Sequence, residues 1–167
     1  MLKTLTSEEI KILNLLESKG NLPVSEISTV LNIEIKQVET IIGNFEKEDI
    51  IIKYKAIVNW EKIESPGVVA LIQVNVTPVK GAGYDEVAKK ISKFDEVHTC
   101  LLVSGAFDLL VEVEGPSLKD VAYFVADKLA TIDGVEHTKT NFLLKRYKQA
   151  GDLFLSNNKT HRLPVAM

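Results

Sequence analysis

The sequence predicts an α+β protein with an N-terminal helix-turn-helix and a C-terminal ferredoxin-like βαββαβ domain. Apolar residues recur at helical spacing in the first part of the chain, and strand and helix patterns alternate in the second. The change falls at Glu64-Ser65-Pro66-Gly67, where proline and glycine interrupt regular structure. We therefore expect a helix-turn-helix, a strand-like linker, a ferredoxin-like domain and a polar C-terminal tail, at residues 1–49, 50–64, 65–150 and 151–167.

Three helices are expected in the first part. The first has Ser7 as its N-cap and stops at Gly20, the second is short and stops at Asn32, and the third covers residues 35–48. Each carries an apolar stripe, formed by Ile10, Leu13 and Leu16, by Ile27, Val30 and Leu31, and by Val38, Ile41, Ile42 and Phe45. Two short helices joined by a turn of three or four residues give a helix-turn-helix outline, which many small helical bundles share.

The second part has strand patterns and helix patterns in the order of a ferredoxin-like domain. Strands are expected at residues 68–77, 97–103, 107–113 and 135–148, and helices at 83–94 and from the Ser117 cap to Asp133-Gly134. This order corresponds to an antiparallel sheet with two helices on one face. Glu112 and Glu114 alternate with valines, so the other face is expected to be partly polar. The fold alone does not define a function.

Composition excludes several classes of protein. No stretch approaches the roughly 20 apolar residues of a membrane span, and we expect no signal peptide at the N-terminus. Cys100 is the single cysteine, so no internal disulfide and no metal site with several thiolate ligands is expected, which favours a cytoplasmic location. The net charge is −3, and this deficit lies entirely in residues 1–64, which have eight lysines against eleven acids. Such a balance disfavours non-specific attraction to polyanions.

Four stretches of sequence follow one another in a distinctive order: Glu9–Leu16, Val38–Ile52, Ser104–Leu109 and Asn141–Tyr147. Together, over roughly residues 5–150, they resemble the Lrp/AsnC family of bacterial and archaeal transcription regulators, the feast/famine regulatory proteins. The turn Ser-Gly-Ala-Phe-Asp that follows a strand is the most distinctive of the four.

The resemblance implies a function and a set of partners. It implies a non-enzymatic, sequence-specific transcription regulator that binds double-stranded DNA and has no cofactor. It further implies a dimer built through the second domain, often assembled into tetramers or octamers. A small-molecule effector, frequently an amino acid, is implied at the interfaces between the second domains.

If the third helix enters a major groove, its polar face must supply the contacts. The candidates on that face are Lys36, Gln37, Thr40, Gly43, Asn44 and Lys47, and Lys53 and Lys55 in the linker, like Lys3, are candidates for phosphate contacts. Many family members carry arginines on this helix, whereas the two arginines here, Arg146 and Arg162, lie elsewhere. Fewer cations predict weak binding that depends on assembly. The alternative is a solvated helix face that does not contact DNA.

The resemblance also places an effector site beside the turn that contains Gly105, for which we expect a positive φ. The candidate residues are Ser104, Gly105, Ala106, Phe107 and Asp108, with His98, Cys100 and Leu102 from the preceding strand and Thr138 and Thr140 from the last. The Asp108 carboxylate would hold an amino group, and the backbone N–H groups of the turn would hold a carboxylate. The alternative is that Asp108 caps the turn and the strand residues belong to the core.

Catalysis has little support in the sequence. His98, His137 and His161 share no metal-ligand spacing, and a Ser104–His98–Asp108 grouping on one hairpin is unlike a catalytic triad. Some proteins with this pair of domains are haem-precursor decarboxylases, but we find no aromatic, arginine and histidine cluster suited to a tetrapyrrole. A third alternative is a ligand-sensing assembly module that has lost DNA binding.

Overall fold

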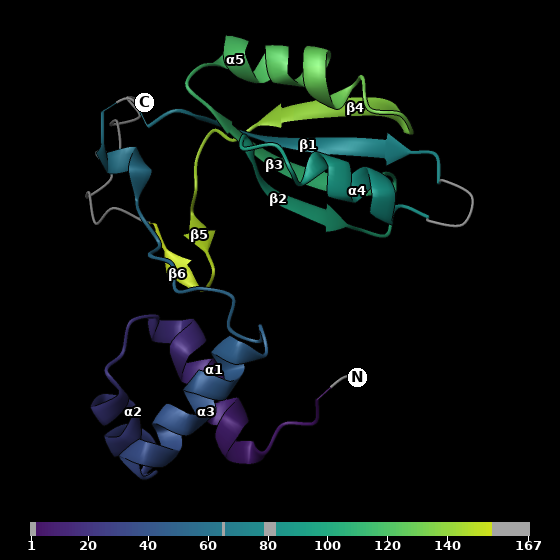
Figure 1. Cartoon of the computed structure of the whole chain (residues 1–167). Helices are drawn as coiled ribbons and strands as arrows, with labels where there is room; N and C mark the ends of the chain where they lie inside the picture. Colours follow the sequence, from purple (N-terminus) through teal and green to yellow (C-terminus); the bar gives the residue numbers. More distant parts are fainter. Residues whose placement is uncertain (1–2, 65, 79–82, 155–167) are drawn as a thin grey trace, which may run out of the picture. The chain divides into compact units, whose positions relative to one another are not determined.

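The computed structural model describes residues 3–64, 66–78 and 83–154, and the predicted tail beyond residue 154 lies outside them. The described chain forms two compact units (Figure 1). One contains the residues up to Val58 together with Lys148–Leu153, and the other contains Asn59–Tyr147 and Phe154. No helix in the described ranges is long and apolar enough to span a membrane.

The first unit contains the expected helix-turn-helix. Its helices are α1 (Ser7–Lys19), α2 (Val24–Leu31) and α3 (Ile35–Lys47). The helices meet in a small core whose buried residues are Ile12, Leu16, Ile27, Ile33 and Val38. The predicted stripes of the first two helices were wrong in part: Ile10 and Val30 are exposed, and Ile12 is buried instead of Ile10 because the inner side of α1 is rotated from the predicted one. Phe45 on α3 is also fully buried. The third stripe is thus confirmed, with Ile41 and Ile42 packing half-buried against the same core.

The prediction of Ser7 as the first N-cap was wrong by one residue. Thr6 is the cap: its hydroxyl accepts a hydrogen bond from the Glu9 N–H (3.2 Å), and the Glu9 carboxylate accepts one from the Thr6 N–H (2.7 Å). This reciprocal pair needs Thr and Glu three residues apart, a spacing that Thr6 and Glu9 have. Because these hydrogen bonds favour the charged carboxylate, the pKa of Glu9 is lowered, first of all by the Thr6 backbone N–H.

The ends of α2 and α3 both use non-glycine residues with positive φ. Asn32 (φ 54°) follows α2, and Asp49 (φ 54°) follows the C-cap of α3. Asn and Asp tolerate this region better than other side chains do. Beyond α3, the N–H groups of Ile50 and Ile51 both donate to the Phe45 carbonyl oxygen (2.9 and 3.1 Å).

The linker is less regular than the strand-like segment that the sequence suggests. Residues 52–59 form neither helix nor paired strand, and a single 3₁₀ turn follows at Trp60–Lys62 (η1). Further along, β5 (Lys148–Gln149) and β6 (Asp152–Leu153) pair in a short hairpin. Ala150 and Gly151 form its turn with φ of 45° and 91°, the signs that a tight two-residue hairpin turn requires.

The second unit has the predicted ferredoxin-like order. Its elements are β1 (Val68–Val76), α4 (Asp85–Ile91), β2 (Val97–Leu102), β3 (Leu109–Gly115), α5 (Leu118–Tyr123), the π-helical continuation η2 (Phe124–Leu129) and β4 (Val135–Phe142). The strands lie in the order β2-β3-β1-β4 and all pair antiparallel. The last helix ends at Leu129 rather than at Asp133-Gly134, and β4 stops at Phe142 rather than near Lys148.

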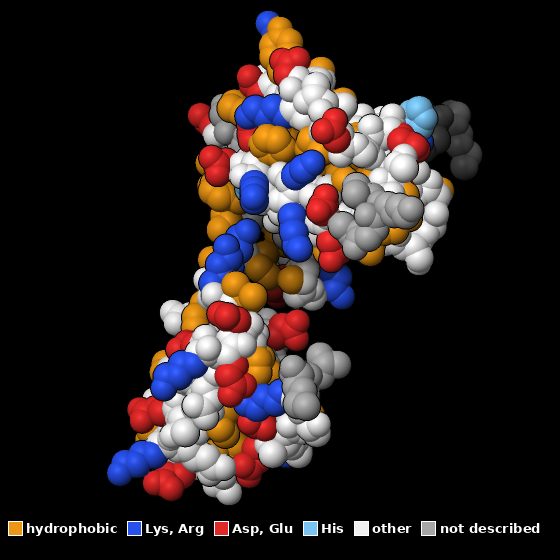
Figure 2. Space-filling model, turned by 45° about the vertical axis from the view of Figure 1, so that its right-hand side comes forward, with side chains coloured by type: hydrophobic (Ala, Val, Ile, Leu, Met, Phe, Trp, Pro, Cys, Tyr) orange, Lys and Arg blue, Asp and Glu red, His pale blue; other side chains and the backbone are white. Residues whose placement is uncertain are grey.

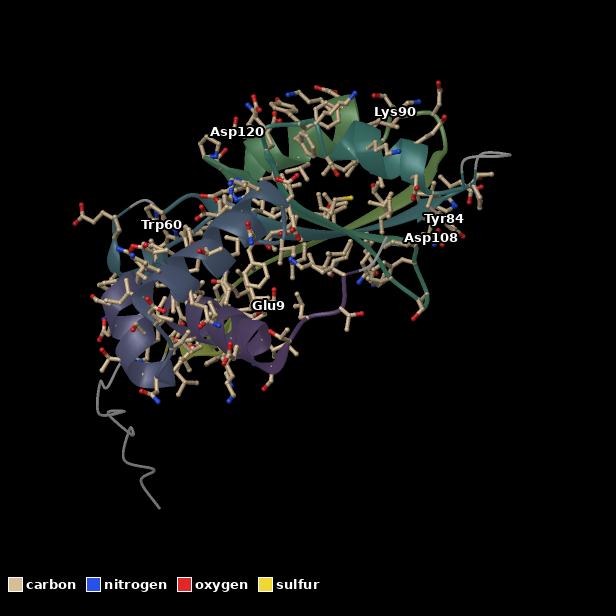
Figure 3. The ribbon with its side chains drawn as sticks, turned by 60° about the horizontal axis from the view of Figure 1, so that its bottom comes forward. Glu9, Trp60, Tyr84, Lys90, Asp108 and Asp120 are labelled. Atoms are coloured by element: carbon tan, nitrogen blue, oxygen red, sulfur yellow. The ribbon has the colours of Figure 1, made fainter. Side chains whose placement is uncertain are left out.

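Both helices of this unit cover the same face of the sheet. Figure 3 shows α4, which carries Lys90, and α5, which carries Asp120, side by side above the strands. Ala70, Ile72, Val74, Leu109, Val111 and Val113 point from β1 and β3 into the core beneath them and are fully buried. Alternation along each strand places Leu71, Gln73, Leu110 and Glu112 on the opposite face, which neither α4 nor α5 covers (Figure 1). We call this opposite face the open face.

Candidate DNA-binding and effector sites

The polar residues predicted on α3 lie on its surface. Lys36, Gln37, Thr40, Asn44 and Lys47 are exposed, and Gly43 is half-buried. A Cβ atom at Gly43 would meet no atom within 4 Å, so this position leaves open space for the close approach of a ligand. The buried Val38 and Phe45 hold the other side of α3 against the core. A rigid helix thus presents all six candidates on one strip of surface.

Two of these side chains already have partners. The Gln37 amide nitrogen Nε2 donates to Glu8 Oε2 on α1 at 2.8 Å. The Thr40 hydroxyl donates to the Lys36 carbonyl oxygen one turn earlier at 2.7 Å. Because the hydroxyl is engaged within the helix, the methyl group of Thr40 is the part left for contact with an apolar group such as the thymine methyl.

The cations of this unit are interspersed with acids. On the face that Figure 2 shows, blue and red side chains alternate over the helix-turn-helix unit, in the lower part of the picture. Lys3 contacts Glu48 (2.8 Å) and Glu9 (3.9 Å), so this phosphate candidate is held by carboxylates. Lys53 and Lys55 are exposed on the linker. No single continuous basic patch therefore marks this face.

The turn between β2 and β3 contains the expected glycine with positive φ, because Gly105 has φ 147°. Asp108 extends the strand pairing at this end of the sheet (Figure 3): its N–H donates to the Val74 carbonyl oxygen (3.0 Å) and its carbonyl accepts from the Val103 N–H (2.9 Å). Its carboxylate Oδ2 accepts from the Val76 N–H at 2.8 Å. The register of β1 against β4 shifts between Asn75 and Val76, and the Asp108 carboxylate supplies the hydrogen-bond acceptor at this irregular end of β1. The carboxylate thus caps the end of β1, a neighbouring strand, whereas the alternative considered from the sequence was a cap on the turn itself.

The three residues at the tip of this turn are exposed. Ser104, Gly105 and Ala106 donate no hydrogen bond from their N–H groups to any described residue. The Ala106 carbonyl oxygen accepts from the side-chain amide of Asn75 (3.3 Å), which ties the tip to β1. Phe107 is half-buried. The tip therefore presents a short run of free donors on an anchored support, as an anion such as a carboxylate requires.

The remaining effector candidates do not meet in one pocket within a single chain. Thr138 and Thr140 lie on β4 and the other candidates on β2, at opposite edges of the sheet, about 14 Å apart at the usual strand spacing. Cys100 packs against the core beneath the helices, and burial raises the pKa of its thiol. Leu102 is exposed at the end of β2. The two sets of candidates are separated because β3 and β1 lie between β2 and β4 in the sheet, an order that the sequence pattern does not indicate.

His98 has a different environment from Cys100. It lies at a register shift in β2, and its Nδ1 is 3.3 Å from Glu114 Oε2. An ion pair near it was not anticipated: Arg146 Nη2 donates to Glu112 Oε1 at 3.1 Å. The Arg146 N–H also donates to Glu61 Oε1 at 2.7 Å. These groups are 34 and 85 residues apart in the chain, and no local pattern in the sequence indicates them.

A helix-turn-helix with a polar exposed third helix, joined to a ferredoxin-like domain whose two helices cover one face of its sheet, defines a two-domain regulator of the DNA-binding class. The Lrp/AsnC ligand binding domain profile matches residues 69–153, and a winged helix-turn-helix DNA-binding profile matches residues 9–52. The chain belongs to the Lrp/AsnC family of transcription regulators, as the resemblance implied.

Individual relatives agree with this assignment. An uncharacterized HTH-type transcriptional regulator, YugG of Bacillus subtilis, is 42% identical over 97% of this chain and 98% of its own length. A second, PH0140 of Pyrococcus horikoshii, is 33% identical over 79% of this chain and 81% of its own. Among solved structures, the transcriptional regulator NMB0573 of Neisseria meningitidis, in complex with L-Met, is 27% identical with a TM-score of 0.69, covering 87% of this chain and 94% of that one.

Proposed function

We propose that this transcription regulator reads duplex DNA with the exposed strip of α3 and responds to an amino acid through its second unit, as a homo-oligomer and without catalysis. The observation that carries the proposal is the exposed polar strip on α3, backed by a fully buried Val38 and Phe45. A helix held in this way can enter a major groove without losing its packing. Because it acts on DNA, we place the protein in the cytoplasm, and we assign it no cofactor.

The proposed DNA contacts divide by chemistry. Gln37 and Asn44 offer amides that pair with adenine edges, and Thr40 offers a methyl for thymine. Lys36 and Lys47 on α3, with Lys53 and Lys55 in the linker, would contact phosphates or guanine. Gly43 would allow close approach of the DNA backbone. Since few cations are available and acids surround them, each half-site binds weakly, and specific binding requires two helices at once.

The test is a gel-shift titration of the full chain on the DNA upstream of its own gene, repeated across salt concentrations. A specific complex with a shallow salt dependence is expected, because few phosphates are neutralised. Absence of a specific complex even at low salt would refute DNA reading. That outcome, combined with intact self-association and effector binding, would favour the sensing module without DNA binding.

Self-association is proposed through the open face. Leu101 pairs with Leu110 across β2 and β3 on this face, and Leu101 is 49% exposed. Leu71 lies beside them on β1. Apolar side chains on an uncovered sheet face are stabilised by a second layer, and a second copy of the sheet supplies one. Further contacts would join dimers into tetramers or octamers.

The variant Leu110→Glu tests this surface. It is expected to convert the oligomer to smaller species in light scattering coupled to size-exclusion chromatography. Leu118→Glu is the matched control, because Leu118 is an exposed leucine on α5, an element that packs on the other face of the sheet. Equal oligomer sizes for the wild type and Leu110→Glu would refute the open face as the interface.

The effector is proposed to be an amino acid bound at the β2–β3 turn, completed by a second chain. The free N–H groups of Ser104, Gly105 and Ala106 suit its carboxylate, and the neighbouring structure carries L-Met. We assign Cys100, Thr138 and Thr140 no contact with the effector, because Cys100 packs against the core of its own chain and the two threonines lie on that same covered face, opposite Val74 and Ile72. A thermal-shift screen of the twenty amino acids tests this, since a ligand that binds the folded state raises Tm. No stabilisation by any of them would refute it.

A further inference from the structure

The acidic residue Glu8 lies beside the reading strip of α3, where a carboxylate repels DNA. It is in the first turn of α1, but the capping box there uses Thr6 and Glu9. Glu8 is therefore not needed to satisfy the backbone at the start of the helix. Its side chain instead contacts Gln37, 29 residues away in the sequence, and both residues line one hollow between α1 and α3 with Lys36 and Thr40.

The chemistry of the contact fixes the orientation of the Gln37 amide. An ionised carboxylate can only accept hydrogen bonds, so the NH₂ group of Gln37 must face Glu8, at 2.8 Å. This leaves Oε1 and the second N–H of the amide unbonded by Glu8. An adenine edge in the major groove needs one acceptor for its N6 amino group and one donor for N7.

We propose that Glu8 is a positioning residue for base readout: it holds Gln37 in the orientation that pairs with adenine. The inference deepens the proposed function and rests on it, because it requires α3 to read DNA. Without Glu8 the amide would rotate freely, and the side chain would lose entropy on binding. With Glu8, a unit of negative charge near the phosphates lowers affinity for every sequence. Glu8 thus lowers the affinity for all DNA sequences and raises the discrimination at one base pair.

The experiment measures base preference position by position, using the full chain and a library of duplexes with a randomised core. The variants are Glu8→Gln, Gln37→Ala and the two combined. Glu8→Gln keeps the size of the side chain, but its amide both donates and accepts, so it no longer dictates the orientation of Gln37. Glu17→Gln is the matched control, because it removes the same charge from the exposed surface of the same helix.

The expected result is confined to one position of each half-site. Gln37→Ala abolishes an adenine preference there, and Glu8→Gln weakens the same preference by about three- to tenfold, a part of what a bidentate contact supplies. Affinity for non-specific duplex rises in Glu8→Gln and not in Glu17→Gln. In the Gln37→Ala background, Glu8→Gln changes no preference, because its partner is gone.

Other outcomes overturn the proposal. If Glu8→Gln shifts all positions equally, Glu8 acts only through its charge. If Gln37→Ala leaves every preference intact, Gln37 reads no base and Glu8 cannot position it, although DNA reading by other α3 residues stands. If the wild-type chain shows no base preference at all, the proposed function fails and the positioning role fails with it.

Discussion

Replacing Asp108 by alanine is expected to open the end of β1. The Asp108 carboxylate accepts the Val76 N–H at 2.8 Å, and Val76 is only 4% exposed. The substitution removes a hydrogen bond to a charged group and leaves a buried N–H without its acceptor. Such a loss costs about 1.5–3 kcal/mol, and we expect the lower half of this range because Asp108 is half-buried and water can reach its site.

Hydrogen exchange measured by NMR reports this loss at the residue concerned. A cost of about 2 kcal/mol raises the exchange rate of the Val76 amide by more than tenfold, because about 1.4 kcal/mol corresponds to a factor of ten. Asp108→Asn keeps an acceptor of similar size but no charge, and its effect is expected to be about half as large. Asp127→Ala, which removes a carboxylate from the exposed surface of η2, is the matched control.

An unchanged exchange rate at Val76 in Asp108→Ala would refute the capping role of the carboxylate. The same variants also separate the two roles considered for Asp108. If Asp108→Asn retains the fold and loses stabilisation by an amino acid, the carboxylate also contacts the effector. If it retains both, the contribution of Asp108 is structural.

Three further outcomes follow from the second unit. Gly134→Ala should lower the free energy of unfolding by about 1–3 kcal/mol in urea titrations, because φ at this residue is 96° and the new Cβ would lie 2.9 Å from Val87 Cγ2. An unchanged free energy of unfolding would contradict that geometry. A double-mutant cycle on Arg146 and Glu112 should give a coupling free energy of about 1 kcal/mol, since both side chains are only about a quarter exposed. Zero coupling would show that the ion pair contributes nothing to the free energy of unfolding. The raised pKa of Cys100 leaves less thiolate at neutral pH, so Cys100 should react with a disulfide reagent more slowly than a free thiol does. Denaturation should remove the difference, and equal rates in the folded chain would refute this prediction.

The elements of the fold could be predicted because local patterns determine them. The stripe of Val38, Ile41, Ile42 and Phe45 needs only helical periodicity, and the strands of the second unit need only alternation. Boundaries were less accurate: Ser7 and Thr6 are both plausible caps, and the reciprocal contact with Glu9 decides between them. The sequence does contain that Thr-x-x-Glu spacing.

The candidate sites could be predicted only in part, because they depend on contacts that are distant in the sequence. The positive φ of Gly105 follows from the turn, and its prediction is confirmed. The hydrogen bond between Glu8 and Gln37 depends on how α1 packs on α3, which no spacing encodes. The same holds for Thr138 and Cys100, whose separation follows from the strand order β2-β3-β1-β4.

The exit of the chain from α3 has a mechanical consequence. Asp49 turns the backbone, and the N–H groups of Ile50 and Ile51 both bond to the carbonyl oxygen of Phe45, whose side chain is fully buried. The linker therefore leaves α3 on its buried side, where Ile51 also packs against the core, and not on its polar strip. A force transmitted along the linker would therefore act on the core of the first unit and move α3 as one body, with the spacing of its polar side chains preserved.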